Sequence, residues 1–160
     1  MRLFIASPVI FDDYAAIQKD FEDIIEGKWV EEENLHLTWV FLGECEDAEP
    51  IKTQLASVVP LEEEVPVTGL GYFGRPPRIF FAKAVSKLLY DKAREFKAAG
   101  FDLYRFKPHI TLCRIKQIRD YRAYKEVLTS YKEKPLGSIL PQIVLYKSNL
   151  DKDGAHYTKL

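Results

Sequence analysis

Hydrophobic residues in the first half of the chain recur at two spacings, one typical of strands and one typical of a helix. Between two apolar, β-branched and aromatic runs, Tyr14, Ile17, Phe21 and Ile24 follow the three-to-four-residue period of an amphipathic helix. Gly27 stands where a helix commonly ends. This half therefore predicts, in order, a strand over Arg2–Ala6, a helix over Asp13–Glu26, a strand over Leu35–Leu42, a helix over Ala48–Val58 and a strand over Val65–Tyr72.

The same order of elements restarts after the turn-rich segment Gly71–Pro77. The second half predicts a strand over Arg78–Val85, a helix capped by Ser86 through Ala99, a strand over His109–Ile115, a helix over Asp120–Tyr131, an edge strand over Ile139–Leu150 containing Pro141, and a turn at Asp151–Gly154 into His156–Leu160. Each half thus reads β-α-β-α-β. We expect a single α+β domain over residues 1–160, an internal duplication with approximate repeats 1–73 and 78–160 packed face to face around a central cleft.

Length and composition exclude several classes of protein. The chain has 160 residues, 47% of them hydrophobic, which suits one compact domain and is too apolar for a disordered chain. No apolar run reaches the roughly 18 residues of a membrane span, and the start does not resemble a secretory leader. Two cysteines, Cys45 and Cys113, do not suggest a disulfide framework. We expect a reduced, cytoplasmic protein without a membrane partner.

Charge is distributed unevenly although the net charge is only −1. Residues 11–64 carry sixteen Asp or Glu against three Lys or Arg, whereas residues 71–134 carry sixteen Lys or Arg against six Asp or Glu. One interpretation is a basic face that binds a polyanion. The other is a set of solvated helix faces with ion pairs between lobes.

The strongest chemical signal is a repeated His-x-Thr motif. His36-Leu-Thr38 and His109-Ile-Thr111 each open an apolar strand, and they lie at matching positions of the two halves. A histidine and the threonine two residues later share one face of a strand, so each pair can hold a phosphate oxygen. Two histidines, one neutral and one protonated, can supply the base and the acid that phosphodiester hydrolysis requires.

A third copy, His156-Tyr-Thr158, shows that the tripeptide alone does not define the site. It follows a turn near the end of the sequence, and we interpret His156 as an exposed residue of a terminal strand. A lone histidine at the start of a strand is more often structural than catalytic. The matching positions of His36 and His109 favour the functional interpretation.

The sequence resembles the two-histidine (2H) phosphoesterase superfamily, and within it the RNA 2′,3′-cyclic phosphodiesterases, also called 2′-5′ RNA ligases. Beside the two motifs, the resemblance includes the segments Arg2–Ala6, Glu32–Thr38 with Phe41–Gly43, Gly71–Phe73, Pro108–Arg114 and Leu145–Ser148. It implies a bilobal duplication in which two antiparallel-rich sheets face a central cleft, with the helices outside. It also implies hydrolysis of RNA 2′,3′-cyclic phosphate ends to a 2′-phosphomonoester, with weak reverse 2′-5′ ligation as a secondary activity.

The same resemblance assigns roles to individual residues. His36 is the implied proton donor to the departing 3′ oxygen and His109 the implied base that activates water. Thr38 and Thr111 are the implied phosphate ligands, with Arg114 as a further basic ligand. Strict alternation would place Arg114 on the strand face opposite His109, so its role requires a bulge or the end of the strand; otherwise it is a solvent-facing arginine.

Other candidates have a structural and a functional interpretation. Phe73, and similarly Tyr72, can stack on a nucleobase or pack in the core. Arg75, Arg78, Arg105 and Lys107 can hold an RNA backbone or simply be surface charges. Cys113 shares parity with His109 and is expected near the floor of the site as a small apolar residue.

No cofactor or metal is expected, because the histidines and cysteines form no local chelating pair and no phosphate-binding glycine loop is present. The expected partner is RNA with a 2′,3′-cyclic phosphate end, or a small cyclic nucleotide, bound by a monomer. Two alternatives remain: a phosphodiesterase acting on 2′-5′ oligonucleotides or small cyclic nucleotides, and a module that binds RNA ends without cleaving them.

Overall fold

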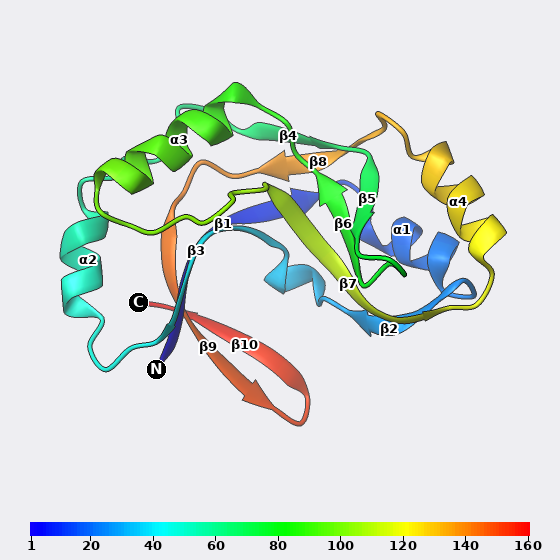
Figure 1. Ribbon diagram of the computed structural model, residues 1–160, viewed down its shortest axis with the longest axis horizontal. Coiled ribbons are helices and arrows are strands. Elements are labelled where there is room, and N and C mark those ends of the chain that lie inside the picture. The colour runs from blue at the N-terminus through cyan, green and yellow to red at the C-terminus, as the bar shows by residue number, and fades with distance from the viewer.

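Two antiparallel β-sheets form the centre of the protein in the computed structural model, which describes all 160 residues (Figure 1). The first sheet has the strand order β10-β9-β1-β8-β4. Strand β3 also pairs with β1, along the edge opposite β9. Its strands are β1 (Arg2–Phe11), β3 (His36–Glu44), β4 (Val65–Thr68), β8 (Pro135–Ile139), β9 (Val144–Asp151) and β10 (Gly154–Lys159). The second sheet has the order β2-β7-β6-β5. Its strands are β2 (Ile25–Trp29), β5 (Leu70–Phe73), β6 (Ile79–Lys83) and β7 (His109–Ile118). The α+β class with two antiparallel sheets is confirmed.

One pair of helices accompanies each sheet, so the molecule has two lobes (Figure 1). The helices are α1 (Tyr14–Phe21), α2 (Glu49–Leu55), α3 (Lys87–Ala98) and α4 (Tyr121–Ser130). Helix α3 packs on the first sheet through Phe96, which stacks on Trp39 of β3. Helices α1 and α4 pack on the second sheet through Phe21 and Tyr124, whose rings both contact Phe80 of β6. We call these the β3 lobe and the β7 lobe, after the strands that carry the two histidines.

The two lobes are not the two halves of the chain. Each sheet combines strands from the first half with strands from the second, and each helix pair takes one helix from each half. Gly69 marks one crossing point: it has a φ of +77°, which favours glycine, and it separates β4 in the first sheet from β5 in the second. The expected strand over Val65–Tyr72 is therefore two strands in two sheets.

The expected bounds of the first helix and of the last long strand were also wrong. The first helix ends at Phe21 rather than Glu26, and Gly27 lies inside strand β2 instead of ending a helix. A Cβ atom at Gly27 would lie 2.4 Å from the carbonyl oxygen of Arg114, so glycine allows β2 to pair closely with β7. The expected strand over Ile139–Leu150 is interrupted around Pro141, which separates β8 from β9.

The two histidine strands pair with their neighbours in the same register. His36 lies opposite Pro8 and His109 opposite Lys83. In both pairings a β-bulge follows three residues after the histidine, with Trp39 and Leu112 as the additional residues. This shared register is what an internal duplication would produce, and it gives both histidines the same position on their strands.

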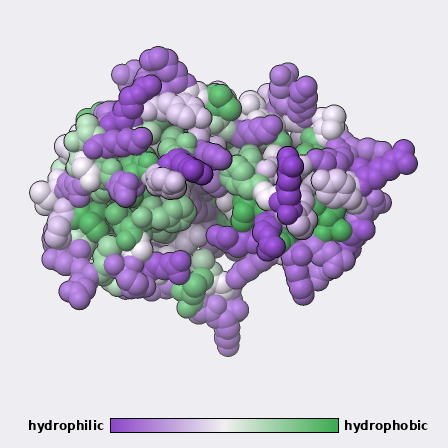
Figure 2. Space-filling view, in the orientation of Figure 1, coloured by the Kyte–Doolittle hydropathy of each residue, from purple (hydrophilic) through white to green (hydrophobic).

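A hydrophobic core of 34 buried residues continues through both lobes and includes Ile5, Leu37, Phe80 and Leu112. None of the four helices is both long and apolar enough to cross a membrane. Figure 2 shows that hydrophilic side chains dominate the β7 lobe on the right of this view, whereas the β3 lobe on the left presents more hydrophobic surface.

Candidate active site

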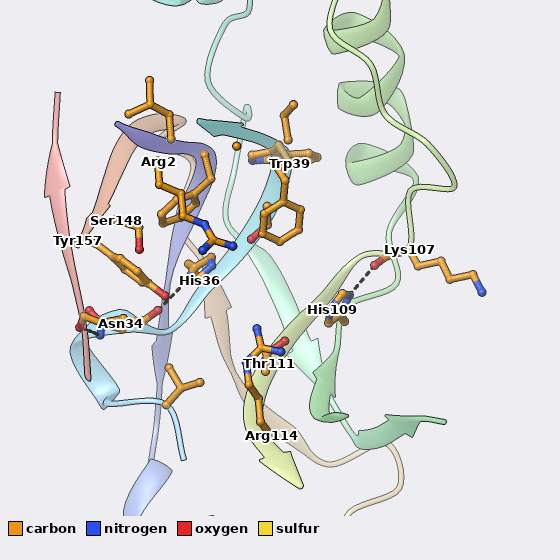
Figure 3. A pocket seen from close by; sticks show the side chains of 18 of the residues that line it. Arg2, Asn34, His36, Trp39, Lys107, His109, Thr111, Arg114, Ser148 and Tyr157 are labelled. Carbon is orange, nitrogen blue, oxygen red and sulfur yellow. Dashed lines mark hydrogen bonds between the residues drawn. The ribbon is translucent and has the colours of Figure 1, made fainter. Parts of the chain in front are cut away.

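A large cleft of about 1170 Å³ lies between the two histidine strands. Both His-x-Thr motifs line it, His36 and Thr38 from β3 and His109 and Thr111 from β7. Figure 3 shows His36 and His109 on opposite sides of the cleft. The charged side chains around it are mostly basic: Arg2, Lys28, Arg105, Lys107 and Arg114 against Glu31, Asp102 and Asp153. The cleft therefore combines two histidines from different lobes with a surplus of positive charge, which favours an anionic ligand.

Each histidine ring is held by the carbonyl group two residues before it. Nδ1 of His36 lies 2.6 Å from the Asn34 carbonyl oxygen, and Nδ1 of His109 lies 2.7 Å from the Lys107 carbonyl oxygen (Figure 3). Because a carbonyl oxygen can only accept, Nδ1 carries the proton in both rings. Nε2 is then the nitrogen left to bind a ligand, as a base when neutral and as an acid when protonated.

The two histidines have different aromatic surroundings. The ring of His36 contacts Phe4 and stands edge-on to Tyr157 with centroids 5.4 Å apart. The ring of His109 stands edge-on to Phe73 at 4.9 Å and contacts Phe81. Both rings are thus fixed by packing as well as by hydrogen bonding, and only His36 has a tyrosine among its aromatic contacts.

Burial lowers the pKa of His36 from its ordinary value, and the charge of His109 lowers it further. The hydrogen bond to the Asn34 carbonyl acts in the opposite direction. The effect of His109 on the His36 pKa is the smallest of these three, and both rings line the cleft.

The β-bulge in β7 decides where Arg114 lies. Thr111 pairs with Phe81 and Arg114 with Ile79, two positions on the same face of β6, because Leu112 is the additional residue. The bulge thereby brings Arg114 to the face that carries His109, and Arg114 lines the cleft (Figure 3). The bulge that Arg114 needs in order to share a face with His109 is therefore present.

The same bulge moves Cys113 away from the site. Cys113 pairs with the core residue Phe80, is fully buried and does not line the cleft, so its expected place at the floor of the site was wrong. Strict alternation would have kept Cys113 on the face of His109, but the additional residue reverses the alternation. Burial raises the pKa of the Cys113 thiol to about 12, which agrees with an inert apolar position.

The remaining candidates divide between the cleft and other surfaces. Phe73 lines the cleft, where its ring packs against Phe81 and against His109. Arg105 and Lys107 also line it, whereas Arg75 and Arg78 do not.

His156 lies outside the cleft, as expected. It is exposed, and its Nε2 atom lies 3.0 Å from the Asp151 carboxylate. The protein contains no group of three or more His, Cys, Asp or Glu side chains arranged to hold a metal ion.

Comparison with known proteins identifies the family. Residues 5–81 match the family described as LigT like Phosphoesterase. An RNA 2′,3′-cyclic phosphodiesterase of Methanocaldococcus jannaschii is 32% identical and covers 98% of this chain and 96% of its own length. The protein of the same name from Aquifex aeolicus is 30% identical, covering 97% of this chain and 90% of its own. The chain belongs to the LigT-like family of two-histidine phosphoesterases.

Solved structures agree with this membership. A crystal structure of a Thermus thermophilus protein matches this LigT-like phosphoesterase with a TM-score of 0.72 and 28% identity, covering 100% of this chain and 95% of that one. E. coli LigT complexed with phosphate matches with a TM-score of 0.69 and 25% identity, covering 99% and 93%. Both likenesses extend over both lobes and therefore over the whole cleft.

Sequence reasoning missed several residues of the phosphoesterase cleft. Arg2, Phe41, Ser148 and Tyr157 all line it. Arg2, Ser148 and Tyr157 come from the two ends of the chain, and only the pairing of β1, β9 and β10 brings them together. The hydrophobic pattern predicted the strands that carry them, but a pattern contains no information on which strands pair.

Proposed function

We propose that this LigT-like phosphoesterase hydrolyses the 2′,3′-cyclic phosphate at an RNA 3′ end and leaves a 2′-phosphomonoester. The observation that carries the proposal is the pair of histidines, His36 and His109, which line one cleft from opposite lobes with Nδ1 anchored and Nε2 free. The names of the relatives from M. jannaschii and A. aeolicus support the same substrate.

In this mechanism one proton is removed and one is supplied on opposite sides of phosphorus. His109 Nε2 accepts a proton from the attacking water as its oxygen bonds to phosphorus. The bond from phosphorus to the 3′ oxygen breaks in line with that attack, and His36 donates the Nε2 proton to the departing oxygen. Each transfer is expected to contribute roughly 10²–10⁴ to the rate. Because the two imidazoles perform both transfers, the mechanism requires no metal ion.

Three further side chains bind the phosphate. Thr38 and Thr111 each share a strand face with a histidine, so their hydroxyl groups donate to the non-bridging oxygens. Arg114 adds a charge-assisted hydrogen bond from the β7 lobe. These donors stabilise the negative charge that develops on the phosphoryl oxygens during attack.

Because the pKa of His36 is lowered, this histidine must gain a proton before it can act as the acid. In the free protein burial favours the neutral imidazole, which has no Nε2 proton to donate. A cyclic phosphate carries a negative charge, and that charge beside His36 favours the imidazolium. Substrate binding therefore favours the protonated form of His36, which is the form that can donate a proton.

The cleft is large for a mononucleotide alone. Its volume of about 1170 Å³ exceeds the roughly 300–1,000 Å³ of a typical small-molecule site. Arg105 and Lys107 add positive charge to its lining. We propose that an RNA chain is the preferred substrate and that single cyclic nucleotides are poorer ones.

We propose weak 2′-5′ ligation as a secondary activity of the same site. If the 5′ hydroxyl of a second RNA replaces water, His109 removes the hydroxyl proton and the 5′ oxygen bonds to phosphorus. The 3′ oxygen departs with a proton from His36, and the phosphate is left bridging the 2′ and 5′ oxygens.

A direct test is to incubate the protein with nucleoside 2′,3′-cyclic phosphates and a chelator and to identify the phosphomonoester by ³¹P NMR. The proposal expects the 2′-phosphomonoester. Formation of the 3′ isomer would reverse the assignment of the leaving oxygen, and loss of turnover in the chelator would contradict metal independence.

A further inference from the structure

A row of three polar side chains crosses the β3 lobe on the wall of the cleft. Ser148 of β9 pairs with Arg2 of β1 on one side and with Tyr157 of β10 on the other. Because paired residues on neighbouring strands point to the same face, the three side chains lie side by side. All three line the cleft and are seen on the side of His36 in Figure 3.

None of the three side chains has an ion-pair or hydrogen-bond partner within the protein. Arg2 forms no ion pair: Glu44, which faces it across β3, binds the amino group of Met1 at 3.3 Å instead. The hydroxyl groups of Ser148 and Tyr157 make no hydrogen bond to the protein. A guanidinium and two hydroxyls that line one wall without partners form a site suited to an anion.

The row is held in place by its surroundings. The Tyr157 ring packs edge-on against Phe4 with centroids 4.9 Å apart and contacts Tyr146. The Asn34 side chain donates a hydrogen bond of 2.9 Å to the carbonyl of Ala155 on β10, while the Asn34 carbonyl accepts from His36. The hairpin that carries Tyr157 is thus tied to the residue that positions His36.

The direction of the reaction places the sugar on this wall. In-line attack puts the departing 3′ oxygen opposite the entering water, so the ribose lies on the side of His36 when His36 is the acid. A substrate in this orientation can direct its 5′ oxygen and the phosphate attached to it over the β3 lobe, where Arg2, Ser148 and Tyr157 line the cleft.

We propose that Arg2, Ser148 and Tyr157 form a second phosphate subsite, which binds the phosphate on the 5′ side of the terminal nucleotide. The subsite rests on the proposed function, and it extends that function from the reacting phosphate to its neighbour in the chain. It makes the enzyme selective for substrates with a 5′ phosphate, and therefore for an RNA end over a free nucleoside cyclic phosphate.

Two substrates that differ only in this group test the subsite. Adenosine 2′,3′-cyclic phosphate lacks the 5′ phosphate, and its 5′-phosphorylated form has it. The wild-type protein is expected to hydrolyse the phosphorylated form with at least tenfold higher kcat/KM. Arg2→Ala is expected to abolish that preference, so that the ratio of the two kcat/KM values falls to about one. Tyr157→Phe keeps the ring beside His36 and is expected to reduce the preference without lowering the thermal midpoint.

Lys147→Ala is the matched control, because Lys147 neighbours Ser148 on β9 but pairs with Leu3 and does not line the cleft. It removes the same charge and is expected to leave the preference intact. An equal loss on both substrates in Arg2→Ala, or an unchanged preference, would overturn the subsite.

Binding of the corresponding products separates the subsite from the proposed function. The subsite expects adenosine 2′,5′-bisphosphate to bind more tightly than adenosine 2′-phosphate, in a manner that depends on Arg2. This comparison holds even if no substrate turns over, in which case the proposed function fails and the subsite stands. Equal affinities for the two products in the wild-type protein would overturn the subsite itself.

Discussion

Phe41 and Arg114 occupy the same position on two equivalent strands. Each lies five residues after the histidine of its strand, beyond a β-bulge, and faces a residue of the neighbouring strand, Phe4 or Ile79. Both line the cleft, and the Phe41 side chain is 80% exposed. The backbone around the two histidines is therefore alike while the side chains differ, a cation in one lobe and an aromatic ring in the other. We expect this difference to favour one orientation of the substrate over the other.

Removal of either histidine is expected to stop catalysis without unfolding the protein. His36→Ala and His109→Ala should each lower kcat by about 10²–10⁴, since each removes one proton transfer. Steady-state kinetics on a cyclic phosphate and a thermal unfolding curve measure the two effects. His156→Ala is the control, because His156 belongs to the third His-x-Thr motif but lies outside the cleft. Near-normal turnover by either of the first two variants would contradict the acid–base pair.

Arg114 is expected to contribute to phosphate binding because the bulge at Leu112 brings it into the cleft. Loss of a charge-assisted hydrogen bond costs about 1.5–3 kcal/mol, so Arg114→Ala should weaken binding of the 2′-phosphate product by roughly 10- to 150-fold. Lys116→Ala is the matched control on the same strand, since Lys116 is exposed, lies near Glu26 and does not line the cleft. Calorimetric titration compares the two variants. Equal affinity in Arg114→Ala and the wild type would show that Arg114 does not bind the phosphate.

The strands that carry the histidines could be predicted from sequence because each is a mostly apolar, β-branched and aromatic run with a histidine at its start. The position of Arg114 could not, because a bulge is a feature of backbone pairing that leaves no periodic signal. Cys113 was misplaced for the same reason. The row of Arg2, Ser148 and Tyr157 depends on the pairing of the first strand with the last two, and such long-range register is not encoded in any local pattern.

Errors in the secondary structure came from residues with two possible roles. Gly27 is equally suited to end a helix and to allow the close approach of two strands, and the sequence favoured the first. Gly69 looked like part of one strand, although its positive φ lets the chain pass from one sheet to the other. In both cases tertiary packing decided the role, and a single sequence contains no direct record of it.

The protonation of His36 is expected to depend on phosphate. Burial and the charge of His109 lower the His36 pKa in the free protein, so this ring should titrate below 6.5. A bound phosphate favours the imidazolium and raises that pKa. Because binding then takes up a proton, affinity for the 2′-phosphate product should rise as pH falls through the interval between the two pKa values.

NMR titration of the histidine rings, with and without product, measures both pKa values. Comparison with His36→Asn separates the contribution of His36 from ionisation of the ligand, which is the same for both proteins. A His36 pKa that does not move at saturating product would show that the phosphate does not lie beside this ring.

Gly27 is expected to be essential for the pairing of β2 with β7. A Cβ atom at this position would lie 2.4 Å from the Arg114 carbonyl oxygen and 2.9 Å from the Cys113 sulfur, so one of the two strands must shift. Overpacking of this kind costs about 1–3 kcal/mol, and Gly27→Ala should lower the free energy of unfolding by that amount in a urea titration. Lys28→Ala, one residue later, is the control and should change it by less than about 0.5 kcal/mol. Because the strain falls on the segment of β7 that carries Arg114, Gly27→Ala should also weaken phosphate binding. A stable variant with unaltered phosphate affinity would show that β2 does not hold Arg114 in place.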